Sequence, residues 1–319
     1  MRSTLAVLVL VAACSGTLEG GMPSDGSTGD AIDAPSAGPP IAAGCITDVT
    51  TGDHTYTCGG LAVEIRIPAA CQSPGCGVIL ELHGDTGSGL LMDGHVRLRE
   101  LGAQHGYIVV APTGPPYGGG QPGSTWSSAN DATLVDIVTQ VSTVFRADAA
   151  KIHVTGFSRG AFVTWRLLCD HADLFASAAP AGGGNGTGFG EPTCFTQGRT
   201  PSRKIPILFL MGRTDSSVGY GSLVQIRDGA IASYAATGPT VLAQDASYSH
   251  SRWTGANGAL IETFDHAYET VSDGPFASAN GHCIPGSTTD PYAVQYAIPC
   301  QLPNAFVWGD AVMQFFLAH

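Results

Sequence analysis

The pattern G-x-S-x-G is formed by Gly156-Phe157-Ser158-Arg159-Gly160, directly after a strand-like run at residues 151–155. Such a turn presents a nucleophilic serine where a strand passes into a helix. The flanking glycines are required because a side chain there would collide with the neighbouring strand or with the helix backbone. Residues 161–168 then have helical spacing. Strand, turn and helix occur in the order that a nucleophile elbow needs, which makes Ser158 the candidate nucleophile.

Apolar runs and helical patterns alternate along the chain after residue 60. Residues 92–105 and 131–145 have helical spacing, and a closing helix is expected at 310–317. This alternation predicts an α/β fold with a mostly parallel central sheet and helices on both faces. Its active site should form at the carboxyl ends of the strands. The expected strands span residues 61–67 (an outer strand, because polar and apolar side chains alternate), 78–82, 107–111, 151–155, 177–180, 205–211 and 259–264.

The first 14 residues have the features of an export signal. Arg2 supplies positive charge, and the apolar stretch 5–13 is too short to span a bilayer. Val11-Ala12-Ala13-Cys14 also resembles the bacterial lipoprotein signal, in which the cysteine becomes lipidated. We therefore expect a lipid on Cys14, with ordinary cleavage nearby as the alternative.

Residues 15–43 consist almost entirely of Gly, Ser, Asp, Ala, Pro and Thr, which cannot bury enough apolar surface to fold. They should form a disordered tether before a single catalytic domain at 44–319, within which no change of composition marks a boundary. We expect an extracellular or surface-tethered monomer that touches a membrane only through the lipid on Cys14. Nucleic acid is not expected as a partner, because the net charge is −12 and no Lys/Arg cluster could neutralise phosphates.

Eight further cysteines fall into four local couples, and an even number in an exported chain predicts disulfides. A zinc site is the alternative, but the sequence has no C-x-x-C pair with histidines at ligand spacing beside it. We expect no metal and no cofactor. The predicted pairs are Cys45–Cys58, Cys71–Cys76, Cys169–Cys194 and Cys283–Cys300.

A serine nucleophile needs a base, and the base needs a carboxylate that orients it. On a scaffold of this kind the order along the chain is Ser, acid, His. Asp215 follows the strand expected at 205–211 and is the candidate acid, although an aspartate there is also suited to capping a helix. His266 directly follows a strand, the usual place for a catalytic histidine, whereas His282 lies in a turn-rich loop beside Cys283. Residue positions alone leave both histidines open as the base.

The oxyanion of an acyl-transfer reaction needs two backbone N–H donors. One is expected at Arg159, directly after the serine, and the other at Asp85 or Thr86 in the loop that follows strand 78–82; a plain turn is the alternative for this loop. Trp126 lies in a long Gly/Pro-rich loop that should overhang the site. It is a candidate substrate-binding residue that would stack on an aromatic or polymeric substrate, or else it packs the loop onto the domain.

Together these motifs resemble the extracellular poly(3-hydroxybutyrate) depolymerase and feruloyl esterase type of α/β-hydrolase. The resemblance extends from about residue 60 to the end of the chain, and it implies Ser158 as nucleophile, Asp215 as acid and His282 as base. It also implies a secreted or surface-tethered bacterial serine esterase that cleaves ester or polyester substrates through an acyl-enzyme. The matching pieces are Leu82-His83-Gly84, residues 105–112, 154–160 and 173–182, Gly212-Arg213-Thr214-Asp215, and Gly281-His282-Cys283-Ile284-Pro285-Gly286, which is similar to the family's G-H-x-W-P-G loop.

Three residues depart from the pattern of this family. Arg159 stands where the family often has a small residue, Ile284 replaces the tryptophan of the histidine loop, and Asp85 stands where polyester depolymerases often have cysteine. The triad is intact, but these changes leave the ester that is cleaved open. An acetylxylan-type or peptide-cleaving hydrolase on the same scaffold is one alternative, and a non-catalytic lipoprotein binding module is another.

Overall fold

The computed structural model describes residues 38–118, 123–186, 192–271, 280–287 and 298–319. The expected export signal, Cys14 and most of the expected tether lie outside these residues. Residues before the predicted domain start at Gly44 already contact the domain, since the Gly38 carbonyl accepts a hydrogen bond from Arg146. Within the described part of the chain, no helix is both long enough and apolar enough to span a bilayer.

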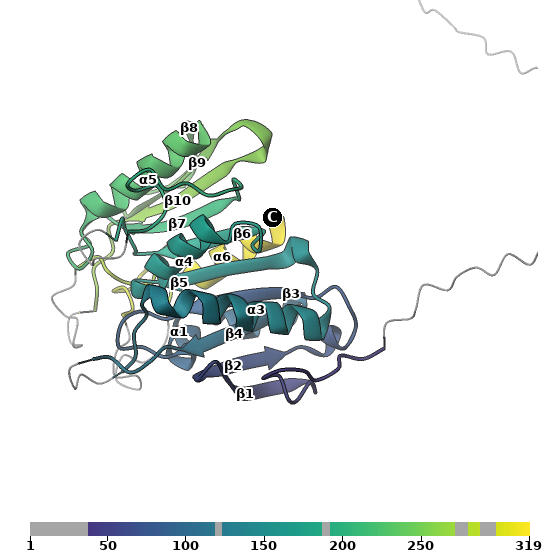
Figure 1. The fold of residues 1–319 in the computed structure, drawn as a ribbon. Coiled ribbons are helices and arrows are strands. Elements are labelled where there is room, and N and C mark those ends of the chain that lie inside the picture. The colour runs from purple at the N-terminus through teal and green to yellow at the C-terminus, as the bar shows by residue number, and fades with distance from the viewer. Residues whose placement is uncertain (1–37, 119–122, 187–191, 272–279, 288–297) are drawn as a thin grey trace, which may run out of the picture. The chain divides into compact units, whose positions relative to one another are not determined.

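Parallel strands form the centre of one ten-stranded sheet, and an antiparallel pair extends it at each edge (Figure 1). The central strands are almost completely buried, which explains why they read as continuous apolar runs. In spatial order they are β4 (Tyr107–Thr113), β3 (Gly77–Leu82), β5 (Ile152–Phe157), β6 (Ser177–Ala181), β7 (Ile207–Gly212) and β10 (Leu260–His266). One edge consists of β2 (Leu61–Ile67) and β1 (Gly52–Cys58), and the other of β9 (Tyr248–Thr254) and β8 (Thr237–Gln244).

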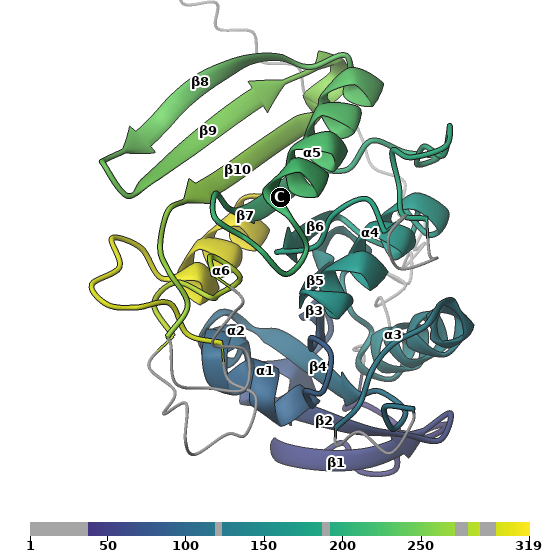
Figure 2. The same ribbon diagram turned by 90° about the vertical axis from the view of Figure 1, so that its left-hand side faces the viewer.

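Helices cover both faces of the sheet, and each face has its own apolar cluster (Figure 2). The predicted mostly parallel α/β architecture is therefore confirmed. Phe316 belongs to the cluster under α1 (Gly89–Val96), α2 (Leu98–His105) and α6 (Trp308–Ala318). Trp165 belongs to the opposite cluster, under α3 (Asp131–Phe145), α4 (Arg159–Asp170) and α5 (Tyr220–Tyr234).

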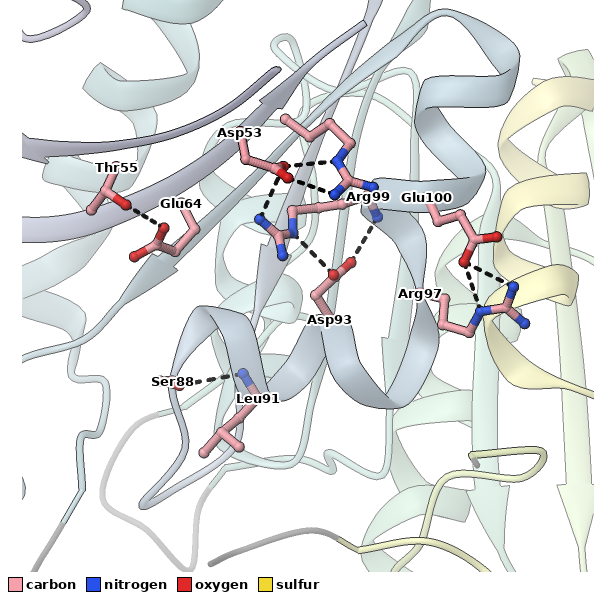
Figure 3. Close-up of polar contacts among 10 residues, drawn as sticks. Asp53, Thr55, Glu64, Ser88, Leu91, Asp93, Arg97, Arg99 and Glu100 are labelled. Carbon is pink, nitrogen blue, oxygen red and sulfur yellow. Dashed lines mark hydrogen bonds and ion pairs between the residues drawn. The ribbon is translucent and has the colours of Figure 1, made fainter. Parts of the chain in front are cut away.

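The strand expected at 61–67 is an outer strand of the sheet, and β1, which the sequence did not predict, pairs with its free side. One prediction about the helices was wrong. The single helix expected at 92–105 is two helices, which are separated at Arg97, a residue with a left-handed φ of 57°. Figure 3 shows the contact that starts the second helix: Asp93 accepts hydrogen bonds from the Arg99 backbone N–H at 2.7 Å and from its Nε at 2.9 Å.

The eight cysteines of the described chain form the four pairs that the sequence predicts. Their Cα–Cα distances lie between 5.0 and 5.4 Å. Disulfides at this density are typical of proteins that fold in an oxidising compartment. The pair Cys283–Cys300 anchors the chain at the residue that follows His282.

Glu81 is the most unusual buried group of the central sheet. It lies in β3 and is fully buried, and neither carboxylate oxygen has a hydrogen-bond partner in the described part of the chain. Burial, reinforced by the negative charge of Asp93, raises the pKa of Glu81 well above its usual value. Above the pKa of an unfolded glutamate, the unfolded chain has lost the proton of Glu81. The folded protein still holds that proton, because its pKa is raised.

We predict that Glu81→Gln will make stability less dependent on pH. The stability that comes from the retained proton is fully present below the unfolded pKa, about 4.3, and is lost as the pH rises toward the folded pKa. The loss amounts to about 1.4 kcal/mol for each unit between the two pKa values. The Tm of Glu81→Gln relative to the parent should therefore rise between pH 4 and pH 8.

Asp173→Asn, which changes an exposed carboxylate without an ion-pair partner in the described part of the chain, is the control and should show a nearly constant Tm difference over the same range. A Tm difference for Glu81→Gln that is equal at pH 4 and pH 8 would contradict the prediction.

Candidate active site

The backbone at Ser158 has the sharp conformation of a nucleophile elbow, with φ 53° and ψ −116°. A non-glycine residue in this region is strained, and neighbouring contacts have to hold it. Here the Ser158 N–H donates to the Ala181 carbonyl at 2.8 Å. A Cβ on Gly160 would lie 2.2 Å from the Leu82 carbonyl oxygen, and one on Gly156 would lie 2.5 Å from the Gly160 carbonyl oxygen. Both glycines of the motif are therefore required by close backbone packing.

Ser158 and His282 line one cavity of ≈ 140 Å³ at the carboxyl ends of the central strands. The wall combines polar side chains with apolar ones that include Met92 and Phe162, with Ile284 from the histidine loop. This composition is usual for a site that binds a small organic group and orients it with a few polar atoms.

Asp215 is bound to His282 and not to His266. His282 Nδ1 donates to Asp215 Oδ2 at 2.7 Å, and both side chains are buried. Asp215 Oδ1 accepts the backbone N–H groups of Ser217 and Val218, each at 2.9 Å. The two roles considered for this aspartate, capping a turn and orienting a histidine, are thus divided between its two oxygens.

The electrostatics of Asp215 agree with this arrangement. Burial alone would raise its pKa, but the hydrogen bond and charge of His282, with the two backbone donors, outweigh burial and lower the pKa. The carboxylate remains ionised and holds the Nδ1–H tautomer of His282. That tautomer leaves Nε2 as the nitrogen that can accept the proton of Ser158.

His266 lies behind this pair and does not line the cavity. Its Nδ1 accepts the Tyr268 backbone N–H at 3.2 Å, and burial lowers its pKa to about 4. Its side chain lies near the sulfurs of Cys283 and Cys300, but these are bonded to each other and offer no thiolates for a metal. The geometry favours His282 as the base and gives His266 a place in the packing.

The oxyanion loop, residues 83–87, lies directly against the nucleophile. A Cβ on Gly84 would lie 3.2 Å from the Ser158 Cβ. The expectation for Thr86 was wrong, because its N–H already donates to the Ser124 carbonyl at 2.7 Å. Asp85 lines the cavity and remains the candidate donor from this loop, opposite Arg159 at the N-terminus of α4.

His83 supports the oxyanion loop, a role that the sequence motifs did not suggest. Its Nδ1 donates to the Gly84 carbonyl at 2.6 Å, and its Nε2 accepts the Gly114 N–H at 2.9 Å. Burial lowers the pKa of His83 to about 4, so the ring stays neutral in the one tautomer that makes both bonds. The only sequence signal for this role is its position, directly after a buried strand and before Gly84.

Trp126 does not contact the cavity in the described structure, so its assignment to substrate binding was wrong. Its indole is 2% exposed. Nε1 donates to the His83 carbonyl at 2.9 Å, and the ring packs on the His83 imidazole with centroids 4.8 Å apart. Trp126 therefore packs its loop onto the domain and supports the oxyanion loop from behind.

No family model matches the sequence. Acetylxylan esterase A of Aspergillus awamori is 32% identical over 113 residues, which cover 32% of this chain and 36% of that protein. Acetylxylan esterase A of Talaromyces purpureogenus is 24% identical over 284 residues, 77% of this chain and 69% of that protein. The chain spans about two fifths of the length of the first curated relatives that it matches.

The solved acetyl xylan esterase from Aspergillus awamori superimposes with a TM-score of 0.54 at 17% identity, covering 67% of this chain and 92% of that one. This chain has the α/β-hydrolase fold. The matched relatives are acetylxylan esterases, whereas the sequence motifs had indicated polyester depolymerases and feruloyl esterases. That finer family resemblance remains a prediction.

Several contacts hold the segment that carries His282. The disulfide Cys283–Cys300 anchors the residue next to His282, and the Gly286 N–H donates to Asn304 Oδ1 at 2.8 Å. The Ser287 hydroxyl lies 2.8 Å from Nδ1 of His95 in α1. The base is thus fixed by contacts outside the triad.

We predict that His282→Ala will lower kcat about 10³-fold or more, because a general base must stand at hydrogen-bond distance from the serine proton. His266→Ala should lose far less activity, since His266 lies outside the cavity. The measurement is kcat and KM for both variants below their Tm. An inactive His266→Ala beside a nearly unimpaired His282→Ala would require His266 to be the base.

We also predict that Cys283→Ala/Cys300→Ala will lower activity more than Cys45→Ala/Cys58→Ala. Only the former pair braces the proposed base, and a misplacement of about 1 Å can cost about 10²-fold in rate. Both double variants should unfold at a lower Tm. Equal kcat values in the two double variants, measured where both are folded, would refute this role for the Cys283–Cys300 bond.

Proposed function

We propose that this chain is an exported serine hydrolase that cleaves carboxylic esters through an acyl-enzyme. The observation that carries the proposal is the 2.7 Å bond between Asp215 and His282, beside Ser158 in one cavity. The acetylxylan esterase relatives and the α/β-hydrolase fold support it. A non-catalytic binding module would not need a buried, ionised acid that orients a histidine in the same cavity as a strained serine.

In the proposed reaction, Ser158 Oγ attacks the ester carbonyl carbon while His282 Nε2 accepts the hydroxyl proton. The negative charge that develops on the carbonyl oxygen is stabilised by the backbone N–H groups of Asp85 and Arg159. His282 then donates its proton to the leaving alcohol, which departs and leaves the acyl group on Ser158. Water, deprotonated by His282, then attacks the acyl carbon, and His282 returns this proton to Ser158 Oγ as the carboxylic acid leaves. Asp215 stays ionised throughout and stabilises the charged form of His282.

For the substrate, we propose acetyl esters on a xylan-type polysaccharide. The support is twofold: the matched relatives are named acetylxylan esterases, and the small, partly apolar cavity suits a short acyl group. Polyester and feruloyl esters are the second candidates, because the sequence motifs resemble the enzymes that cleave them. Stacking of an aromatic acyl group on Trp126 is not available, since that indole is buried.

The four disulfides support an extracellular location, and we keep the lipid on Cys14 as a further proposal. A tethered esterase could reach polymeric substrates near the cell surface.

We predict that the parent protein hydrolyses p-nitrophenyl acetate and releases acetate from acetylated xylan, and that Ser158→Ala abolishes both activities. The Tm should change little, because the hydroxyl acts in chemistry and not in packing. Methyl ferulate and amorphous polyhydroxybutyrate, assayed in parallel, test the second candidates. Esterase activity that survives in Ser158→Ala would overturn the proposed function, whereas faster turnover of methyl ferulate or polyhydroxybutyrate would overturn only the acetyl specificity.

A further inference from the structure

An ion pair joins the two residues that carry the proposed oxyanion donors. Arg159 Nε lies 3.2 Å from Asp85 Oδ1 and 3.3 Å from Oδ2. The two side chains are 14% and 27% exposed, so water screens the pair only in part. The Thr125 hydroxyl also donates to Asp85 Oδ1, and the guanidinium of Arg159 lies over the Phe162 ring at 5.9 Å.

We propose that this ion pair is a positioning device that sets the separation between the two oxyanion donors. The inference rests on the proposed function and adds a role for side chains that neither the triad nor the fold requires. The backbone N–H groups of Asp85 and Arg159 would contact the reacting oxygen, while their side chains keep the two backbone segments at a fixed separation. Each donor must lie within about 2.7–3.1 Å of the oxyanion, so a small relative shift lowers the rate.

The two donor segments touch through the backbone at Gly160 and Gly84, but each also has supports of its own. Arg159 begins α4, which packs on the end of β3 through Gly160. The oxyanion loop is held instead by the segment before α3, where Thr86 bonds to Ser124. Thr86 also has a left-handed φ of 64°, a conformation that a β-branched residue adopts only under restraint. The Asp85–Arg159 pair connects this restrained loop to the helix that carries the other donor.

A second ion pair on α4 provides a matched control. Arg166 donates to Asp131 through Nε at 2.7 Å and through Nη2 at 2.8 Å, which ties α4 to the start of α3. Neither residue lines the cavity. If the ion pairs of α4 affect only stability, breaking either pair will lower the Tm and leave kcat unchanged.

The experiment compares Asp85→Asn, Arg159→Gln and the double variant with p-nitrophenyl acetate as substrate. We expect kcat to fall about 10- to 100-fold, less than the roughly 10²- to 10³-fold cost of losing one donor outright. KM should stay within about threefold, because the donors act mainly on the transition state. The double variant should be no slower than the slower single variant, since the two side chains act as a unit. Arg159→Lys, which keeps the charge, should recover part of the loss.

Two further measurements separate positioning from stability. Affinity for phenylboronic acid, which forms a tetrahedral adduct with the serine, should fall in parallel with kcat. Amide hydrogen exchange in residues 83–87 should accelerate in Asp85→Asn and Arg159→Gln. Asp131→Asn should lower the Tm but leave kcat, boronate affinity and exchange in this loop unchanged.

The outcomes distinguish this inference from the proposed function. Suppose that the parent hydrolyses the ester. The positioning role is then wrong, and the proposed function stands, if both single variants retain the parent's kcat or if only KM changes. The same holds if the losses of transition-state stabilisation in the two single variants add up in the double variant. If the parent has no Ser158-dependent activity, the proposed function is wrong and the role in positioning oxyanion donors falls with it. Hydrogen exchange then tests only whether the ion pair holds the loop, and unchanged exchange in residues 83–87 would show that it does not.

Discussion

The packing of α4 on the end of β3 is the constraint on which the site depends. The helix can approach so closely only because Gly160 has no side chain where the Leu82 and His83 carbonyl oxygens lie. The same approach accompanies the strained positive φ of Ser158 and places this residue against Gly84. Nucleophile and oxyanion loop therefore come together through backbone contact, before any polar side chain takes part. A larger residue at position 160 would separate both from the sheet.

A second close approach brings the acid and the base together. A Cβ on Gly212 would lie 2.0 Å from the Gly281 carbonyl oxygen, and one on Gly281 would lie 2.6 Å from the Asp215 nitrogen. The histidine loop thus folds back directly onto the end of β7, and Asp215 meets His282 there. Because Asp215 is already fixed by two backbone donors, its free oxygen is oriented before the histidine binds. Pre-orientation of this kind lowers the reorganisation needed during proton transfer.

The sequence predicts those elements whose side chains are buried, or follow one regular pattern, from the first residue to the last. Buried parallel strands read as apolar runs, and the elbow reads as a glycine pattern. The break at Arg97 is invisible because helical spacing continues across it, and only the contact of Asp93 with the next helix reveals it. The strand β8 is exposed along its whole length and therefore has no hydrophobic period. The choice between His266 and His282 depends on the path of a loop, which position after a strand does not encode.

Asp85 and Arg159, two of the residues that depart from the pattern of the polyester depolymerases and feruloyl esterases, are linked in the structure. Taken singly, each places a charge near a partly apolar cavity, where an unpaired charge would be costly. Together they neutralise each other at 3.2 Å and leave both backbone N–H groups in place. The charge of one residue thus offsets the desolvation of the other, and the pair adds a link between loop and helix. Replacing either residue alone by an uncharged one would remove the ion-pair partner of the other charge. The two positions therefore act together in the site.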